Sequence, residues 1–284
     1  MKTYNDLYLD NKHALQNIGD ENAQFEARLI LAQSAGKSVS QILSCRDLYV
    51  NSEVEENNTS FMNRLLKGEP IAYILNNWEF YGLPFYVDSN VLIPRIDTET
   101  VIDTIKKLFP DSKAKLRILD LCTGSGNIAC TLAYYFPNCH VTAIDYSQSA
   151  LDICKKNILD LRLGGQVSCI RADVKNKPDT KLGLYDLIVS NPPYIRTEEI
   201  KTLDASVRDY EPHMALDGGK DGYDFYKAII TNYSILLKSD CYMIFEVGEE
   251  QFKNVSKLFI DFGYSSSNTV KDSAGTERVV IGKK

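Results

Sequence analysis

The chain has 284 residues, of which 44% are hydrophobic and 25% are charged, and this composition is typical of a soluble globular protein. That length is enough for one large hydrophobic core and a smaller second domain. The formal net charge of −6 argues against a protein that binds nucleic acid through many phosphate contacts.

The N-terminal region, residues 1–75, shows helical periodicity and predicts a small helical domain. Phe25, Leu29 and Ala32 recur at a helical spacing that predicts one buried face, and Gly36 is a typical helix stop. The region holds 7 basic and 10 acidic side chains, so we expect no basic patch there. It is interpreted either as a helical lid on the main core or as a partner-recognition module.

The next region, residues 76–96, predicts a β-hairpin linker. Aromatic residues alternate there with Gly82 and Pro84, a pattern that indicates a hairpin. We expect the remaining residues, 97–284, to form a catalytic domain of the α/β class.

The α/β domain has a predicted strand, glycine loop and helix near its start. The strand is expected at 117–122 and the helix at 127–136, with Thr123-Gly124-Ser125-Gly126 between them. Small loop residues let backbone N–H groups approach a ligand closely, and a helix N-terminus favours an anionic group. A second predicted strand, 140–146, brings Asp145 to the place where an acid accepts hydrogen bonds from ribose hydroxyls. The pattern therefore predicts a nucleotide-type binding unit.

Two further predicted strands end in polar residues at the same sheet edge. The strand 167–173 ends in Asp173, and the apolar run 187–189 leads into Asn191-Pro192-Pro193-Tyr194. The prolines make this loop rigid, so the Asn191 side-chain oxygen and the Pro192 carbonyl can accept the N–H bonds of a planar NH2 group. Tyr194 offers a flat face for stacking. The loop therefore predicts a site that holds the nitrogen of a planar NH2 group facing an electrophile. Alternatively, the loop is a turn stiffened by its two prolines.

Later segments complete the predicted domain. Strands are expected at 242–247 and 277–282, and helices at 221–238 and 249–262. The segment Asp217–Gly222 is interpreted as a flexible turn, with a lid as the weaker alternative.

Cysteine and histidine usage predicts neither a disulfide framework nor a metal site. The seven cysteines form no C-x-x-C pair, which indicates buried thiols in a reducing compartment, and the three histidines lack ligand spacing. Residues 1–10 have no apolar signal-peptide core, and the uncharged stretch 121–144 contains loop residues that argue against a membrane span. We therefore expect a cytoplasmic protein with no membrane association.

Together, these motifs resemble the seven-stranded, Rossmann-like methyltransferases that use S-adenosylmethionine to methylate planar nitrogens. More narrowly, the chain resembles the PrmC/HemK family, which methylates the glutamine of the GGQ motif in class I peptide chain release factors and so modulates translation termination. The segments that carry the narrower resemblance are Gly68–Leu75, Glu79–Phe85, Val91–Arg95, Asp204–Gly222 and Asp272–Val280. The resemblance implies a protein-(glutamine-N5) methyltransferase whose helical domain recognises the release factor.

The resemblance also implies roles for individual residues. It implies cofactor contacts by Cys122, Thr123, Gly124, Ser125, Gly126, Asp145, Asp173, Val174 and Asn191. It implies that Asn191, Pro192, Pro193 and Tyr194 bind the substrate glutamine, and that Asn191, Pro192 and Tyr194 are catalytic. The amide nitrogen would attack the sulfonium methyl directly, giving S-adenosylhomocysteine, without a general base or a metal. We expect a monomer that acts on a release factor and contacts no nucleic acid directly.

Two positions depart from the family pattern. Cys122 stands where the family commonly has glycine, so we expect a negative φ there. Asp97 stands where the family commonly has glutamate, which leaves the role of this acid open. Arg95 and Glu99 match the family, but an exposed pair and an acid at a helix start would also account for them.

Two alternatives remain open from the sequence. An adenine-N6 methyltransferase of DNA or RNA uses the same kind of Asn-Pro-Pro-Tyr loop to bind a planar amine. Such an enzyme also needs a flipped base and a basic surface. The other alternative is a non-catalytic partner protein that binds S-adenosylmethionine, and Cys122 is its only support.

Overall fold

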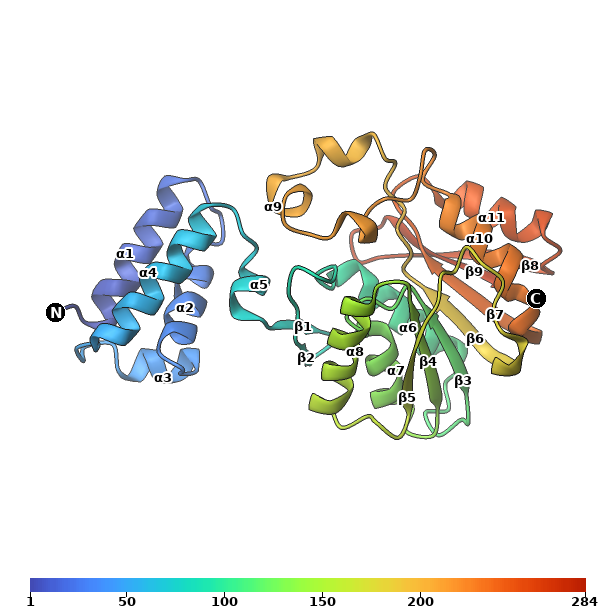
Figure 1. Cartoon of the computed structure of the whole chain (residues 1–284), viewed down its shortest axis with the longest axis horizontal. Coiled ribbons are helices and arrows are strands. Elements are labelled where there is room, and N and C mark those ends of the chain that lie inside the picture. Colours follow the sequence, from blue (N-terminus) through green and yellow to red (C-terminus); the bar gives the residue numbers. More distant parts are fainter. The chain divides into compact units, whose positions relative to one another are not determined.

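The computed structural model describes residues 1–284 and divides the chain into two compact units (Figure 1). The first unit comprises residues 1–77 and the short segment 205–210. The second unit comprises residues 78–204 and 211–284.

The first unit is built of helices. They are α1 (Tyr4–Asn17), α2 (Ala23–Ser34), α3 (Val39–Ser44), α4 (Ser52–Leu66), α5 (Ile71–Leu75) and α9 (Ala205–Arg208). Thr3, Ser38 and Asn51 start α1, α3 and α4 because each side chain accepts a hydrogen bond from a backbone N–H of the first turn. These caps explain where three of the helices begin.

The buried face of α2 differs from the predicted one. Phe25 is 58% exposed, whereas Ala27, Ile30 and Leu31 are completely buried. The helix packs against α1 and α4, and its smaller side chains let those helices approach closely. The aliphatic residues of α2 can form either of two overlapping hydrophobic faces. Packing against α1 and α4 buries the face that does not contain Phe25.

The second unit opens with a two-stranded hairpin. Strands β1 (Trp78–Phe80) and β2 (Leu83–Phe85) pair in antiparallel fashion. Tyr81 and Gly82 connect them with φ values of 53° and 75°, the left-handed conformation that tight hairpin turns use.

A seven-stranded sheet forms the centre of the second unit, in the order β5-β4-β3-β6-β7-β9-β8. Its strands are β3 (Arg117–Leu121), β4 (His140–Asp145), β5 (Val167–Arg171), β6 (Tyr185–Ser190), β7 (Leu237–Glu246), β8 (Ser266–Lys271) and β9 (Glu277–Lys283). Strands β3 to β7 run parallel, while β9 is antiparallel to both β7 and β8. The predicted seven-stranded α/β fold is confirmed.

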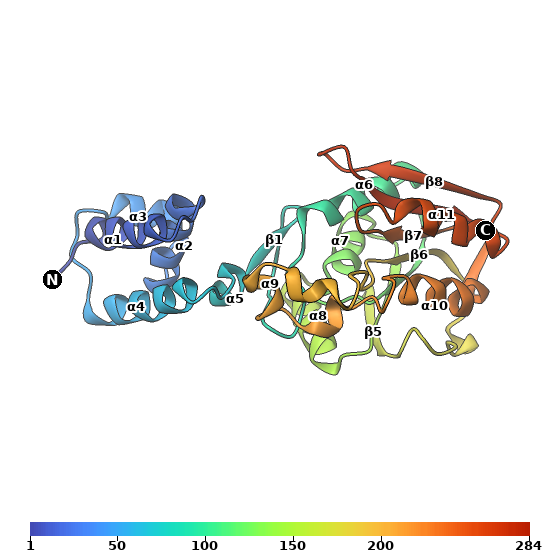
Figure 2. The same ribbon diagram turned by 90° about the horizontal axis from the view of Figure 1, so that it is seen from above.

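Helices cover both faces of this sheet. They are α6 (Glu99–Leu108), α7 (Asn127–Tyr135), α8 (Gln148–Asp160), α10 (Asp224–Tyr233) and α11 (Phe252–Asp261). Helices α10 and α11 lie side by side (Figures 1 and 2) and share a core with Met243 and Phe245 of β7. The opposite face of β7 lies toward α6, because Tyr242 packs edge to face against Phe109 at the end of α6. Alternate residues of β7 therefore serve two different cores.

Short 3-10 turns join several of these elements. They are η1 (Ile96–Thr98), η2 (Thr180–Leu182), η3 (Glu199–Thr202), η4 (His213–Ala215) and η5 (Ser234–Leu236).

Several boundaries differ from the predicted ones. Helix α10 is shorter than the predicted helix 221–238, because Leu237 and Lys238 already belong to β7. Strand β8 was not predicted, since its sequence Ser-Ser-Asn-Thr-Val-Lys is mostly polar and no residue of the strand is fully buried. The uncharged stretch 121–144 divides into a strand end, α7 and β4, and no helix in the structure has the length and hydrophobicity needed to cross a membrane.

Candidate active site

A cavity of about 380 Å³ opens at the carboxyl edge of the sheet, a volume typical of small-molecule sites. Its wall contains most of the residues predicted to bind the cofactor: Cys122, Thr123, Gly124, Ser125, Asp145, Asp173, Val174 and Asn191. Pro193 also lines the cavity, whereas Gly126, Pro192 and Tyr194 do not. Four separate strand ends are thus brought together, as expected for a parallel sheet of this kind.

The position of Gly126 is constrained by packing of the loop. It lies at the N-terminus of α7 with a φ of 79°. A Cβ at this position would lie 2.5 Å from Sγ of Cys154 on α8. Glycine is required there because the loop passes directly over this helix.

Side chains fix the glycine loop from two sides. Asp145 at the end of β4 accepts a hydrogen bond from the backbone N–H of Gly124 at 2.9 Å. Asn157 of α8 donates to the carbonyl of Ser125 at 2.9 Å and also bonds both backbone groups of Tyr86. The loop is therefore held in place by protein groups alone.

Carboxylates concentrate at this edge of the sheet. Asp120 is 1% exposed, and its Oδ1 atom is buried without a hydrogen-bond partner. Burial raises the pKa of Asp120 to about 7 and also raises the pKa of Asp145. Asp173 lies on the wall of the same cavity. Asp145 and Asp173, the two carboxyl groups on the cavity wall, favour a ligand that carries positive charge.

The expectation of a negative φ at Cys122 is wrong, because its φ is 58°. The left-handed region costs an ordinary residue roughly 1–2 kcal/mol. Hydrogen bonds on both sides enforce it: Thr123 N–H donates to the carbonyl of Ile144 at 3.0 Å, and the Ser190 hydroxyl donates to the carbonyl of Leu121 at 2.6 Å. Burial also raises the pKa of the Cys122 thiol. The cysteine thus takes the backbone conformation that glycine adopts most easily.

The Asn-Pro-Pro-Tyr loop follows directly after β6. Asn191 lines the cavity, and its Nδ2 donates a hydrogen bond to Oγ1 of Thr98 at 3.3 Å. Tyr194 is turned toward the protein, where its ring lies close enough to Gly248 that a Cβ there would be 3.0 Å from a ring carbon. Burial raises the pKa of Tyr194 well above its usual value. Asn191, rather than Tyr194, is therefore the member of this loop most open to a ligand.

The segment 217–222 is pinned against this loop and is not the free turn that was predicted. The N–H of Ile195 donates to the carbonyl of Leu216 at 3.0 Å, and the carbonyl of Ile195 accepts from the N–H of Gly218 at 2.8 Å. A Cβ on Gly218 would lie 2.6 Å from Cα of Tyr194. The prediction failed because glycines signal close approach as well as flexibility.

Gln251, just before α11, ties several of these parts together. Its Nε2 donates to the carbonyl oxygens of Tyr194 at 3.0 Å and Gly222 at 3.3 Å. Its Oε1 accepts from the N–H of Gly248 at 3.0 Å and from the hydroxyl of Tyr226 at 3.3 Å. One buried amide thereby satisfies four groups around the loop.

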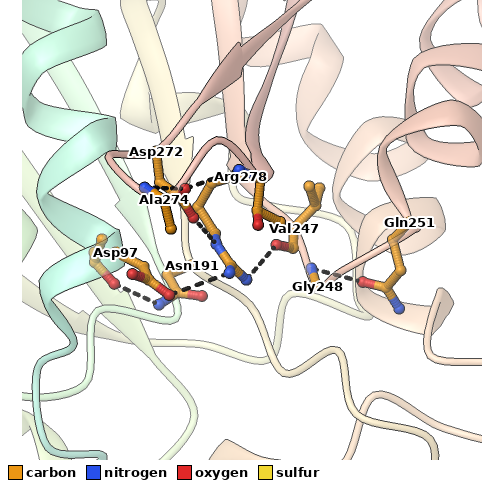
Figure 3. A network of polar contacts seen from close by, with 10 residues as sticks. Asp97, Asn191, Val247, Gly248, Gln251, Asp272, Ala274 and Arg278 are labelled. Atoms are coloured by element: carbon orange, nitrogen blue, oxygen red, sulfur yellow. Dashed lines mark hydrogen bonds and ion pairs between the residues drawn. The ribbon is translucent and has the colours of Figure 1, made fainter.

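Arg278 on β9 forms a second polar network (Figure 3). Its guanidinium pairs with Asp97 at 3.1 Å and with Asp272 at 3.2 Å, and it donates to the carbonyl of Val247 at 3.3 Å. The shorter acid at position 97 is thus an ion-pair partner of Arg278. It joins the start of α6 to the C-terminal strands.

Arg95 and Glu99 do not form an exposed pair with each other. Arg95 pairs with Glu211, which is almost fully buried, at 2.5 Å. Glu99 accepts a hydrogen bond from the N–H of Tyr81 at 2.7 Å and so anchors the hairpin turn to α6. Both partners lie far away in the sequence, which is why local reasoning did not find them.

The structure adds residues that the sequence did not single out: Thr98, Glu246, Gln251 and Arg278. Glu246 carried one usable signal, because it is an acid that directly follows the apolar run 243–245, as Asp145 follows its own strand. The other three have no such pattern, because the contacts that tie them to the site, those with Asn191, Tyr194 and Asp97, span 57 or more residues.

Two family models match the chain. A PrmC N-terminal domain matches residues 7–75, and a methyltransferase small domain matches residues 95–209. A release factor glutamine methyltransferase of Clostridium botulinum is 34% identical over 279 residues, which cover 98% of each chain. A protein of the same name from Fusobacterium nucleatum is 38% identical over 240 residues, covering 83% of this chain and 67% of that protein. This chain belongs to the release factor glutamine methyltransferase family.

Solved structures share the fold of this family member at low sequence identity. The hMettl16 catalytic domain in complex with the MAT2A 3'UTR hairpin 6 has a TM-score of 0.59 and 15% identity, covering 72% of this chain and 76% of that one. A methyltransferase from Pyrococcus furiosus has a TM-score of 0.51 and 20% identity, covering 79% and 98%. These likenesses concern the fold alone.

Family membership confirms the resemblance predicted from the sequence, and the protein is a methyltransferase. The roles of the individual site residues stay predictions.

Proposed function

We propose that this release factor glutamine methyltransferase transfers a methyl group from S-adenosylmethionine to the N5 amide nitrogen of the glutamine in the GGQ motif of class I peptide chain release factors. The proposal depends mainly on the position of Asn191, which lines the same cavity as the glycine loop and Asp145. The names of relatives that match over nearly the whole chain support the choice of substrate.

The cavity suits S-adenosylmethionine in charge as well as in size. Asp145 and Asp173 on the cavity wall complement a cationic ligand. The N-terminus of α7, reached through Gly124 and Ser125, suits its carboxylate. Asp145 is placed to accept from ribose hydroxyls, and Val174, which is 4% exposed, adds an apolar wall for the adenine.

The chemistry needs positioning more than proton transfer. When bound, S-adenosylmethionine would supply a sulfonium methyl for in-line attack by the amide nitrogen. Neutral S-adenosylhomocysteine would leave, and the extra proton of the methylated nitrogen would pass to water. Asn191 Oδ1 and the Pro192 carbonyl accept the two N–H bonds of the glutamine amide and stabilise the positive charge that develops on nitrogen. Pro193, on the cavity wall, keeps this backbone rigid. No general base and no metal are required.

We further propose that the helical unit recognises the release factor and that the enzyme acts as a monomer in the cytoplasm. The match of residues 7–75 to a PrmC N-terminal domain supports a family-specific role for these helices. The net charge of −6 disfavours nucleic acid as a partner or substrate.

The deciding experiment is transfer of labelled methyl from S-adenosylmethionine to a purified class I release factor. We expect label on the intact factor and none on a variant in which the GGQ glutamine is replaced. Label on duplex DNA in a parallel reaction would move the assignment to the adenine-N6 methyltransferases. Binding of S-adenosylmethionine with transfer to neither substrate would indicate a non-catalytic partner protein.

A further inference from the structure

Asn191 and Glu246 lie level with each other at the ends of neighbouring parallel strands. Ser190 of β6 is paired with Phe245 of β7, so the next residue of each strand reaches the same height. Phe245 faces the core shared with α10 and α11. Because side chains alternate along a strand, Asn191 and Glu246 both point to the opposite side, where α6 begins.

Thr98 stands between these two side chains. Its Oγ1 accepts a hydrogen bond from Asn191 Nδ2 at 3.3 Å, and its hydroxyl lies near the Glu246 carboxyl, where it acts to lower the pKa of that group. Thr98 and Glu246 are each 1% exposed, and Oε2 of Glu246 is buried without a hydrogen-bond partner. A buried carboxyl group thus lies behind the threonine that accepts a hydrogen bond from the predicted catalytic asparagine.

The orientation of the Asn191 amide depends on which of the three side chains, Asn191, Thr98 and Glu246, donate hydrogen bonds and which accept them. A carboxylate only accepts hydrogen bonds, so an ionised Glu246 takes the hydroxyl hydrogen of Thr98. The Thr98 oxygen is then left as an acceptor, and only the NH2 end of Asn191 satisfies it. Asn191 Oδ1 must therefore face away from Thr98. A reversed amide would present its own N–H groups to the N–H groups of the substrate.

We propose that Glu246 is a positioning residue that fixes the polarity of the Asn191 amide through Thr98. This inference rests on the proposed function, because Asn191 Oδ1 is the acceptor for the substrate amide. Glu246 touches no substrate atom in this role. It acts by making one of two orientations of Asn191 the stable one.

The surroundings of Glu246 make the orientation of the Asn191 amide sensitive to pH. Burial raises the pKa of Glu246 to about 7, while Arg278 on β9 and Arg95 before η1 favour its charged form and Asp97 opposes it. Tyr194 faces it from the loop after β6. A protonated Glu246 can donate to Thr98, which frees the Thr98 hydroxyl to donate to Asn191 Oδ1 and so reverse the amide. Turnover should therefore rise as pH increases through about 7.

The first test compares three threonine variants in methyl transfer to a release factor. Thr98→Val removes the hydroxyl and should lower kcat about tenfold, the value of one hydrogen bond, with the Kd for S-adenosylmethionine unchanged. Thr98→Ser keeps the hydroxyl and should restore turnover. Thr104→Val is the matched control, since it removes a buried threonine hydroxyl within α6 that bonds the carbonyl of Thr100. Wild-type turnover in Thr98→Val, or an equal loss in Thr104→Val, would overturn the proposal.

The second test follows kcat against pH in the wild type and in Glu246→Gln. Glutamine has nearly the same shape but does not ionise, so the rise near pH 7 should disappear and kcat should become independent of pH in this range. Asp120, whose pKa burial also raises to about 7, would instead give a rise that persists in Glu246→Gln, and that outcome would refute the role of Glu246. Absence of transfer by the wild type would contradict the proposed function itself, which keeps the two failures distinct.

Discussion

Gln251 Nε2 donates a hydrogen bond to the carbonyl oxygen of Tyr194 at 3.0 Å, across 57 residues of sequence. The same side-chain amide bonds the carbonyl of Gly222, the N–H of Gly248 and the hydroxyl of Tyr226. The backbone that follows Asn191 is therefore positioned by a side chain that has no contact with the cavity.

Replacing Gln251 should impair catalysis without weakening cofactor binding. Gln251→Leu leaves the carbonyl of Tyr194 and the N–H of Gly248 without their partner, which should lower the free energy of unfolding by about 2 kcal/mol. It should also reduce kcat. Gln148→Leu, at an exposed glutamine of α8 that bonds Asp152, is the control. Equal kcat values for the two variants would show that the hydrogen bonds of the Gln251 side chain have no effect on turnover.

Asn191→Ala should reduce turnover far more than it reduces binding of S-adenosylmethionine. Loss of one acceptor dipole costs on the order of 3 kcal/mol in the transition state, or roughly a hundredfold in kcat. Steady-state kinetics and calorimetric titration of the cofactor measure the two effects separately. Asn138→Ala, at an exposed asparagine that bonds the carbonyl of Lys113, controls for the substitution type. Equal losses in turnover and cofactor affinity would contradict the division of roles.

Substitutions at Cys122 should follow its positive φ of 58°. Cys122→Val places a β-branched residue in the left-handed region and should destabilise the protein by about 2 kcal/mol relative to Cys122→Gly. Thermal unfolding of the two variants gives the difference. Cys241→Val lies on β7, where β-branched residues fit, and should be tolerated. The explanation fails if valine and glycine at position 122 give the same stability.

Acid should weaken the network around Arg278. Burial acts to raise the pKa of Asp272, but hydrogen bonds from Thr276 N–H and the Arg278 guanidinium outweigh it, so the pKa lies below its usual value. The stabilisation is therefore complete above the unfolded-state pKa of about 4 and is lost as pH falls through the lower folded-state pKa. Asp272→Asn should flatten the fall in unfolding free energy measured between about pH 5 and pH 2. An unchanged slope would exclude Asp272 as its source.

The central sheet and the glycine loop could be predicted from the sequence because their signals are local. The run Leu187–Val189 is completely buried in the sheet, and Asp145 and Asn191 lie at strand ends on the cavity wall, as their positions after apolar runs indicated. Phe25 shows the limit of such reasoning, since two helical stripes fit the same residues and only packing against α1 and α4 decides between them.

The supporting residues of the site escaped prediction for a different reason. Thr98, Gln251 and Arg278 have unremarkable neighbours in the sequence, and the fold brings each of them to a partner far along the chain: Asn191, Tyr194 and Asp97. Cys122 shows the same dependence, because hydrogen bonds from Thr123 and Ser190 enforce its conformation. Local sequence indicates where the ligand-facing atoms lie, but not what holds them there.

The short segment 205–210 has a practical consequence for dissecting this protein. Because it belongs to the helical unit, the chain passes between the units at three places, after residues 77, 204 and 210. A single cut after residue 77 would not release an intact catalytic fragment, since Tyr210 would lose the carbonyl of Lys67 to which it donates at 2.9 Å. A self-sufficient fragment needs residues 205–210 replaced by a short polar bridge, and a protease nick at position 77 alone should leave the two pieces associated.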